Sequence, residues 1–158
     1  MKHIDTSETM RALIQRVRSA SVTIEGEEVS RIGAGLLILL GVATDDTPAD
    51  VDYLVRKASA LRIFDDTEGV MNLDVRQCAG EVLVVSQFTL MASTRKGNRP
   101  SYIAAAGELT AVPLYEEFLA KMSEAVGRPV AAGRFGADMQ VGLVNDGPVT
   151  IWLDSRER

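Results

Sequence analysis

The stretch GLLILLGVATDDTPAD, residues 35–50, contains a buried strand followed by the start of a helix. Residues 35–43 are almost continuously apolar, which is typical of a strand covered on both faces of a sheet. Thr47 can cap the helix that follows, Pro48 fits its first position, and Asp50 stands where a capping box places an acid. The next apolar residues recur at helical spacing and predict one face packed on the core: Val51, Leu54, Val55, Ala58 and Leu61.

On either side of this stretch the sequence predicts mainly strands. Residues 11–17 and 81–88 have the composition of strands. Residues 21–33 contain two short strand-like runs with a turn at Glu25–Gly26 between them, which predicts a hairpin.

The C-terminal part predicts one more helix and two more strands. The helix is expected from about Pro113 to Ala125, with Gly127 as its stop signal. Its apolar face consists of Tyr115, Phe118, Leu119, Met122 and Val126. Residues 139–153 alternate in polarity but are interrupted at residues 145–148, which predicts two strands joined by a tight turn. Because two helices cover only one side of a sheet, we expect an α/β fold with two β layers and one helical layer.

The composition fits one soluble domain over residues 10–158. The net charge is −5, and the single cysteine, Cys78, excludes an intrachain disulfide and favours a cytoplasmic location. No apolar run approaches the roughly 20 residues needed to span a bilayer, so no membrane association is expected. Residues 1–9, MKHIDTSET, are polar and precede Met10, and we expect them to form a disordered N-terminal extension.

The only histidine, His3, lies in that extension. A Ser-His-Asp or Cys-His hydrolase, which needs imidazole as its general base, is therefore excluded from the folded region. Zinc sites usually draw on several His and Cys ligands, and this chain has one of each. Asp45–Asp46 and Asp65–Asp66 could bind Mg²⁺ through oxygen alone, but we favour ordinary turns and caps for them. Catalysis would therefore have to proceed without histidine, through hydroxyls, amides, carboxylates, lysine or a group of the substrate.

The segment VLVVSQFTL, residues 82–90, begins as a buried strand and then becomes polar. Ser86, Gln87 and Thr89 surround Phe88 at its end. Burial of hydroxyl and amide groups costs free energy unless they are hydrogen-bonded. These side chains must therefore find partners, in the protein or in a ligand.

Two further segments each have a plain and a functional interpretation. TRKGNRP, residues 94–100, is a solvated loop or a contact for phosphate through its three cations, Arg95, Lys96 and Arg99. The negative net charge argues against a general nucleic-acid binder but not against such a local patch. NDGPVT, residues 145–150, is a strand-to-strand turn or a rigid backbone tip presented to a ligand, because Pro148 lacks an N–H and Gly147 permits unusual backbone geometry.

SQFTL at residues 86–90 together with NDGPVT at 145–150 resembles the D-aminoacyl-tRNA deacylase family. The resemblance extends in the same order to RALIQRVRSASVTIEG at the start, TRKGNRPSY after the first motif and GRFGADMQVGLVNDGPVTIWL at the end. It covers about Met10 to Leu153. Each motif is weak alone, but both in this order are specific.

This resemblance implies a homodimer, with a mixed, barrel-like β/β/α fold, that hydrolyses the ester of D-aminoacyl-tRNA and of glycyl-tRNA without metal or cofactor. It implies that Gly147-Pro148 is cis and enters the partner subunit's pocket, where its backbone excludes an L side chain. The implied catalytic pocket contains Ser86, Gln87, Phe88 and Thr89. The implied supporting residues are Arg16, Asn145, Met139 and Phe135, and the implied tRNA contacts are Arg95, Lys96 and Arg99. The RNA's own 2′-hydroxyl would assist the cleavage, which fits a fold without histidine.

Two alternatives and one open assignment remain at this point. The chain could be a serine or threonine hydrolase for small esters, or a non-enzymatic module whose basic loop binds an anion. Within the favoured hypothesis, Thr89 could be a nucleophile, but no base is in view to activate it. We favour a positioning role, with Thr89 and backbone amides near Phe88–Thr89 holding the ester and stabilising the oxyanion.

Overall fold

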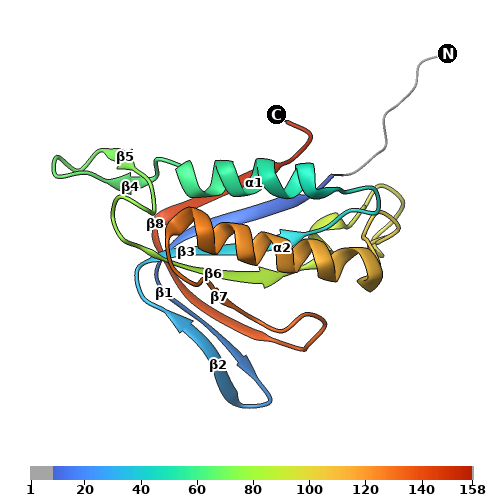
Figure 1. The fold of residues 1–158 in the computed structure, drawn as a ribbon. Coiled ribbons are helices and arrows are strands. Elements are labelled where there is room, and N and C mark those ends of the chain that lie inside the picture. Colours follow the sequence, from blue (N-terminus) through green and yellow to red (C-terminus); the bar gives the residue numbers. More distant parts are fainter. Residues whose placement is uncertain (1–8, 158) are drawn as a thin grey trace.

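The computed structural model describes residues 9–157, which form a mixed six-stranded sheet with two helices on one face (Figure 1). The strands of this sheet are β1 (Arg11–Ile24), β2 (Glu27–Ile32), β3 (Gly35–Gly41), β6 (Glu81–Ser86), β7 (Ala131–Ala132) and β8 (Gln140–Asp154). The helices are α1 (Pro48–Ala60) and α2 (Glu108–Val126), with a 3₁₀ helix at Phe88–Met91; β4 (Phe64–Asp65) and β5 (Met71–Leu73) form a separate hairpin. No helix in this part of the chain is long and apolar enough to cross a membrane.

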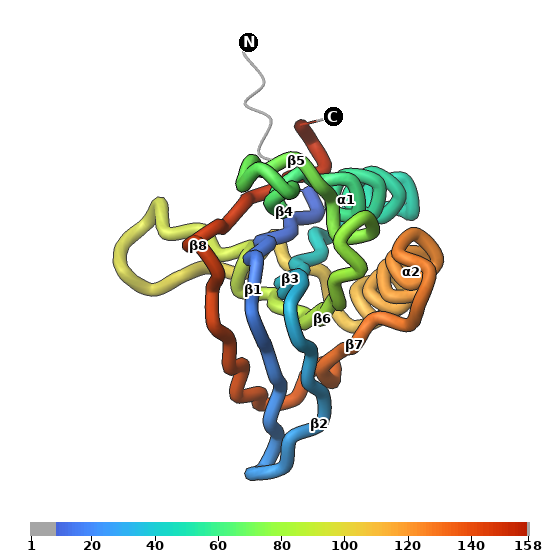
Figure 2. Tube along the Cα trace, turned by 90° about the vertical axis from the view of Figure 1, so that its left-hand side faces the viewer, coloured from blue at the N-terminus to red at the C-terminus, as the bar shows by residue number. Residues whose placement is uncertain are grey.

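Strand β1 organises the sheet because it pairs along both edges (Figure 2). On one edge its first half, residues 11–17, pairs with β3, and its second half, residues 20–24, pairs with β2. The other edge pairs with β8. Strands β3, β6 and β7 are parallel neighbours, whereas the partners of β1 are antiparallel. The sheet therefore divides and curls, which confirms the mixed, barrel-like α/β architecture predicted from the sequence.

Two apolar cores lie on opposite faces of strand β3. Leu36, Ile38 and Leu40 belong to the core beneath the helices, together with the fully buried Phe118 of α2. Leu37 points the other way, into a second core enclosed by the curled sheet. Alternate side chains of a strand point to opposite faces, so a run of leucine and isoleucine supplies both cores at once. This arrangement explains the continuous apolar run of residues 35–43.

Helix α1 begins as the local sequence predicts, whereas α2 does not. In α1, the backbone N–H of Thr47 donates to Asp50 Oδ2 at 2.8 Å, as in a capping box. Helix α2 begins at Glu108 rather than at Pro113, which lies inside it. The early start follows from packing: Ala111 and Leu114 lie on the same buried face on either side of the proline. Burial of that face therefore outweighs the hydrogen bond that the proline removes.

Both ends of the described chain meet at a group of buried carboxylates. Met10 is fully buried, and its N–H donates to Asp46 Oδ1 at 3.0 Å. Of the predicted extension, residues 1–8 lie outside the described residues. Thr9 lies within them: its hydroxyl donates to Asp154 and accepts the N–H of Arg156.

Candidate active site

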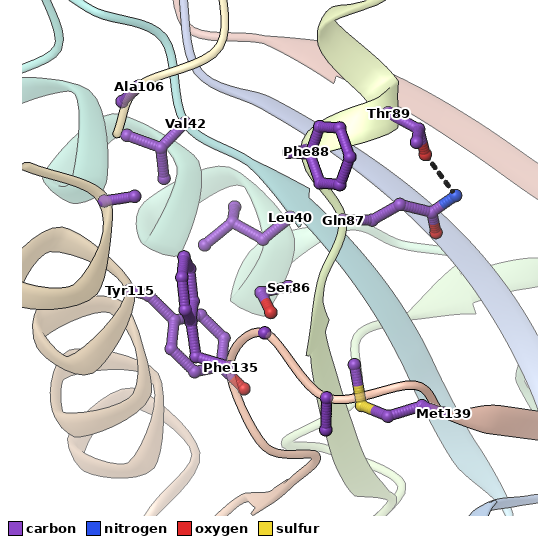
Figure 3. A pocket seen from close by; sticks show the side chains of 13 residues that line it. Leu40, Val42, Ser86, Gln87, Phe88, Thr89, Ala106, Tyr115, Phe135 and Met139 are labelled. Carbon is purple, nitrogen blue, oxygen red and sulfur yellow. Dashed lines mark hydrogen bonds between the residues drawn. The ribbon is translucent and has the colours of Figure 1, made fainter. Parts of the chain in front are cut away.

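A pocket of about 200 Å³ opens where strands β3 and β6 end (Figure 3). Its walls come from the end of β3, the segment after β6, helix α2 and the loop before β8. The lining residues are Leu40, Val42, Ser86, Gln87, Phe88, Thr89, Ala106, Ala111, Tyr115, Phe135, Gly136, Ala137 and Met139. The structure thus brings together all four predicted pocket residues and two of the predicted supporting residues, Phe135 and Met139.

The polar segment turns into this pocket because β6 ends at Ser86, two residues earlier than predicted. The strand stops at Ser86, and the expected strand at residues 87–88 is instead the entry to the 3₁₀ helix. The N–H of Gln87 donates to Leu40 O at 2.8 Å, and this hydrogen bond joins the start of the turn to β3. Gly41 permits the close approach, since a Cβ there would lie only 3.0 Å from Leu90 Cβ and 3.1 Å from Gln87 O. The chain can therefore bend tightly over the end of β3.

The polar side chains of this segment partly satisfy one another. Gln87 Nε2 donates to Thr89 Oγ1 at 2.9 Å, and the hydroxyl of Ser86 points into the cavity (Figure 3). Phe88 is 56% exposed at the rim, and its ring packs edge-to-face on Tyr102 with centroids 5.0 Å apart. The pocket therefore combines hydroxyl and amide groups with an exposed aromatic rim.

The opposite wall of the pocket is apolar and contains two aromatic rings. The rings of Tyr115 and Phe135 lie 6.0 Å apart, and the Tyr115 hydroxyl donates to Val84 O at 3.1 Å. Burial raises the pKa of Tyr115 to about 12, so this phenol stays neutral at physiological pH. Tyr115 thus anchors α2 to the middle of β6 rather than acting as a base.

Two of the four carboxylates considered for Mg²⁺, Asp46 and Asp66, accept backbone N–H groups. Asp46 Oδ2 accepts from Ala43 at 2.7 Å, and Asp66 Oδ1 accepts from Glu68 and Val70. Among residues 9–157, no group of three or more His, Cys, Asp or Glu side chains is placed to hold a metal ion. Both aspartates therefore have the turn roles that the sequence favours.

The Gly-Pro segment forms a corner that bulges out of strand β8. Gln15 pairs with Thr150 and Val17 with Asn145, so residues 146–149 lie opposite Arg16 alone. The chain then continues along the same edge of β1, and the predicted pair of strands joined by a tight turn is therefore wrong. A hairpin would reverse the chain, but here both halves find a partner in the long strand β1.

Side chains on both strands hold this corner, which consists of residues 146–149. Gly147 has a φ of +138°, and the Gly147-Pro148 peptide bond is cis. The side chain of Asn145 bridges the two ends of the corner: its Oδ1 accepts the N–H of Val149 at 2.8 Å. Arg16 Nε donates to Asp146 O at 2.8 Å. Asn145 and Arg16 therefore both hydrogen-bond the backbone of the corner.

The corner and the pocket are separate within one chain. Gly147 and Pro148 are exposed, and neither is among the described residues that line the pocket. The basic loop, in contrast, begins close to the pocket: Ser93 and Ser101 exchange two backbone hydrogen bonds of 2.8 Å at its base, next to Tyr102. Its cations, Arg95, Lys96 and Arg99, are all exposed.

Comparison with known proteins identifies the family of this chain. The family model described as D-Tyr-tRNA(Tyr) deacylase matches residues 13–154. The chain belongs to this family. The prediction made from the two motifs is thereby confirmed.

Individual relatives match this chain over nearly their whole length. A D-aminoacyl-tRNA deacylase of Opitutus terrae is 61% identical over 149 residues, which cover 94% of this chain and 99% of the relative. That of Chromobacterium violaceum is 57% identical over 147 residues, 93% of this chain and 98% of the relative. Both matches thus span nearly the whole chain.

Two solved structures match the whole fold. One, described as c-Myc DNA Unwinding Element Binding Protein, superposes with a TM-score of 0.87 and 41% identity, covering 91% of this chain and 97% of the other. Another, described as a probable eukaryotic D-amino acid tRNA deacylase, gives a TM-score of 0.79 at 18% identity, covering 92% and 98%. The second likeness concerns the fold alone.

Sequence reasoning missed part of the pocket. Ala106, Ala111 and Tyr115 line it, although only Tyr115 had been singled out, as a core residue of the second helix. Tyr115 does lie on the predicted apolar face of the helix, but the apolar pattern does not reveal which residue of that face borders a cavity.

Proposed function

We propose that this chain hydrolyses the ester bond of D-aminoacyl-tRNA to free amino acid and tRNA. The observation that supports this most strongly is the polar 86–89 segment lining a pocket in a chain 57–61% identical to D-aminoacyl-tRNA deacylases. In this proposal the pocket binds the aminoacyl group and the terminal adenosine, and the exposed ring of Phe88 offers a stacking surface at its rim.

The proposed chemistry is positioning and oxyanion stabilisation. The N–H groups of Phe88 and Thr89 begin a 3₁₀ helix, so neither has an acceptor within that helix. In this proposal they hold the ester carbonyl as negative charge develops on its oxygen. Water adds to the carbonyl carbon, and the ribose oxygen leaves with a proton. In this proposal the neighbouring 2′-hydroxyl of the substrate assists, since the described residues include no histidine.

Selectivity for the D configuration is proposed to come from the corner of a second copy of the chain in a homodimer. The corner is exposed and does not line the pocket of its own chain, and β8, which contains the corner, pairs on one edge only. Leu143, Val144 and Trp152 of this strand are also exposed, which favours coverage by a partner. A backbone filter excludes the L side chain sterically and would accept glycine, so glycyl-tRNA is included among the proposed substrates.

The basic loop is proposed to contact tRNA phosphates. Arg95, Lys96 and Arg99 concentrate positive charge next to the pocket rim on a chain with a net charge of −5. Lysine and arginine contacts to phosphate make binding salt-dependent. Inhibition by uncharged tRNA should therefore weaken as salt is raised.

The deciding experiment compares the hydrolysis of D-tyrosyl-tRNA and L-tyrosyl-tRNA by the purified chain, with uncharged tRNA as a competitor. We expect rapid turnover of the D ester only. Equal rates for both esters would refute the chiral filter. Turnover of small esters that uncharged tRNA does not inhibit would favour the small-ester hydrolase, and no turnover at all would favour the anion-binding module.

Replacing Thr89 by alanine tests the assignment of this side chain. We expect kcat to fall less than about tenfold, because the variant loses one neutral hydrogen-bonding hydroxyl, worth about 1 kcal/mol, and keeps the backbone N–H groups proposed to hold the oxyanion. The measurement is single-turnover hydrolysis of D-tyrosyl-tRNA, with Thr89→Ser as the control that retains the hydroxyl. A loss of several orders of magnitude, with an acyl-enzyme trapped in the unmodified protein, would instead make Thr89 the nucleophile.

A further inference from the structure

The small hairpin of β4 and β5 touches the corner through the side chain of Arg16. Arg16 Nη1 donates to Ile63 O at 2.7 Å, just before β4, and lies 3.6 Å from Asp65 Oδ1. On its other side, Arg16 Nε donates to Asp146 O at 2.8 Å. A single guanidinium therefore connects this hairpin to the corner at residues 146–149.

This connection is well suited to transmit position. The guanidinium is planar, and its donors have a fixed geometry, so fixing one side orients the other. The side chain of Arg16 is only 11% exposed, which limits its alternative conformations. A Cβ at Gly147 would lie 3.0 Å from Arg16 Nη2, so the guanidinium also lies directly against the corner.

The hairpin itself is held in shape by its own side chains. Asp66 Oδ1 accepts the N–H groups of Glu68 at 2.8 Å and Val70 at 3.1 Å. Arg62 Nε donates to Asn72 O at 2.9 Å and closes the base. The hairpin is thus a stiff element rather than a loose loop next to Arg16.

We propose that Asp65 is a positioning residue for the Gly147-Pro148 corner and acts through Arg16, with the β4–β5 hairpin as the brace. This inference rests on the proposed role of the corner in selecting D substrates. Within this brace, the carbonyl of Ile63 accepts a hydrogen bond from Arg16, and the carboxylate of Asp65 forms an ion pair with it. Asp65 is 55% exposed, so its ion pair adds little to global stability, and its effect should appear in the placement of the corner.

The test compares Asp65→Ala with Glu68→Ala, an equal loss of charge on the same hairpin at an exposed residue whose side chain has no bond to Arg16. The first readout is hydrogen exchange of the backbone N–H of Val149, which the corner protects through Asn145. We expect exchange to speed up about two- to fivefold in Asp65→Ala, as expected for loss of an exposed ion pair, and to stay unchanged in Glu68→Ala. Asp65→Glu should restore most of the protection.

The second readout is the ratio of kcat/KM for D-tyrosyl-tRNA over L-tyrosyl-tRNA. It should fall about two- to fivefold in Asp65→Ala, and the same change should have no further effect in an Arg16→Gln background. Unchanged exchange at Val149, or an equal loss with and without Arg16, would overturn the brace. An unmodified protein that does not discriminate the two esters would overturn the proposed function, while the exchange result would still decide the brace.

Discussion

Replacing Gly147 by alanine is expected to lower kcat/KM for D-tyrosyl-tRNA by about 100-fold and to abolish most of the discrimination against the L ester. The added Cβ would lie 2.8 Å from Val149 Cγ2 and 3.0 Å from Arg16 Nη2, both of which help to define the corner. The φ of +138° is also a conformation that L residues rarely adopt. The corner must therefore move, and a displacement of about 1 Å at a positioning element can cost this much.

The measurement is steady-state hydrolysis of both tyrosyl esters, with Gly26→Ala and Gly142→Ala as controls. Gly26 has a φ of +82° and open space around it, so its alanine variant introduces backbone strain far from the corner. Gly142 lies on the same strand as Gly147, and a Cβ there would meet only the side chain of Ser21 at 3.1 Å. Full activity and selectivity in Gly147→Ala would show that the corner has no role in catalysis.

Replacing Asp46 by alanine is expected to lower the free energy of unfolding by about 2–4 kcal/mol. The carboxylate is buried and accepts the N–H groups of Met10 at 3.0 Å and Ala43 at 2.7 Å. Removal of the acceptor leaves two buried donors unpaired, and each such donor costs about 1–3 kcal/mol. Asp45→Ala, at the exposed neighbouring acid, is the matched control. Chemical denaturation measures both, and equal stabilities would contradict the structural role of Asp46.

The same residue should make stability depend on pH. Burial raises the pKa of Asp46 to about 7, with the charges of Asp50 and Asp154 adding to the effect, although the N–H bonds from Ala43 and Met10 act in the opposite direction. The unfolded chain has an ordinary aspartate pKa of about 3.9. Between these values the folded state binds more protons, so this contribution to stability is lost as pH rises from about 4 to 7.

Unfolding measured at several pH values between 5 and 8 tests this linkage. We expect the stability difference between the unmodified chain and Asp46→Ala to shrink over this range, and the difference from Asp45→Ala to stay constant. Parallel pH profiles for all three proteins would show that Asp46 is ionised throughout. The consequence extends to the pocket, because Val42, whose carbonyl accepts the N–H of Ala106 at 2.9 Å, belongs to the loop that Asp46 holds.

Local features of the fold could be predicted because neighbouring residues decide them. Thr47 and Asp50 form their cap within one helical turn, and Glu25 and Gly26, both with positive φ, form the predicted hairpin turn. The alternation of Leu36 and Leu37 between the two cores follows from the pleat of a strand. The family was likewise visible in SQFTL and NDGPVT, the segments that supply part of the pocket lining and the corner.

Other features could not be predicted because they depend on residues far apart in the chain. Strand β6 ends at Ser86 because its neighbour β3 ends, and α2 continues through Pro113 because both sides of the proline have a core to pack on. Strand β8 passes the Gly-Pro corner without reversing, since β1 is long enough to pair with both halves. The sequence pattern around each of these points was locally ambiguous.

The sequence by itself thus determined the buried strands, the helix cap, the chemistry of the candidate site and the family. Only the tertiary structure decided that pocket and corner lie apart in one chain, and that Arg16 links the corner to Ile63 and Asp65. The physical reason is the distance along the sequence between the residues that interact. Hydrogen bonds and side-chain periodicity within a few residues are encoded locally, whereas the point at which distant strands pair, end or bulge depends on the whole set of packed partners.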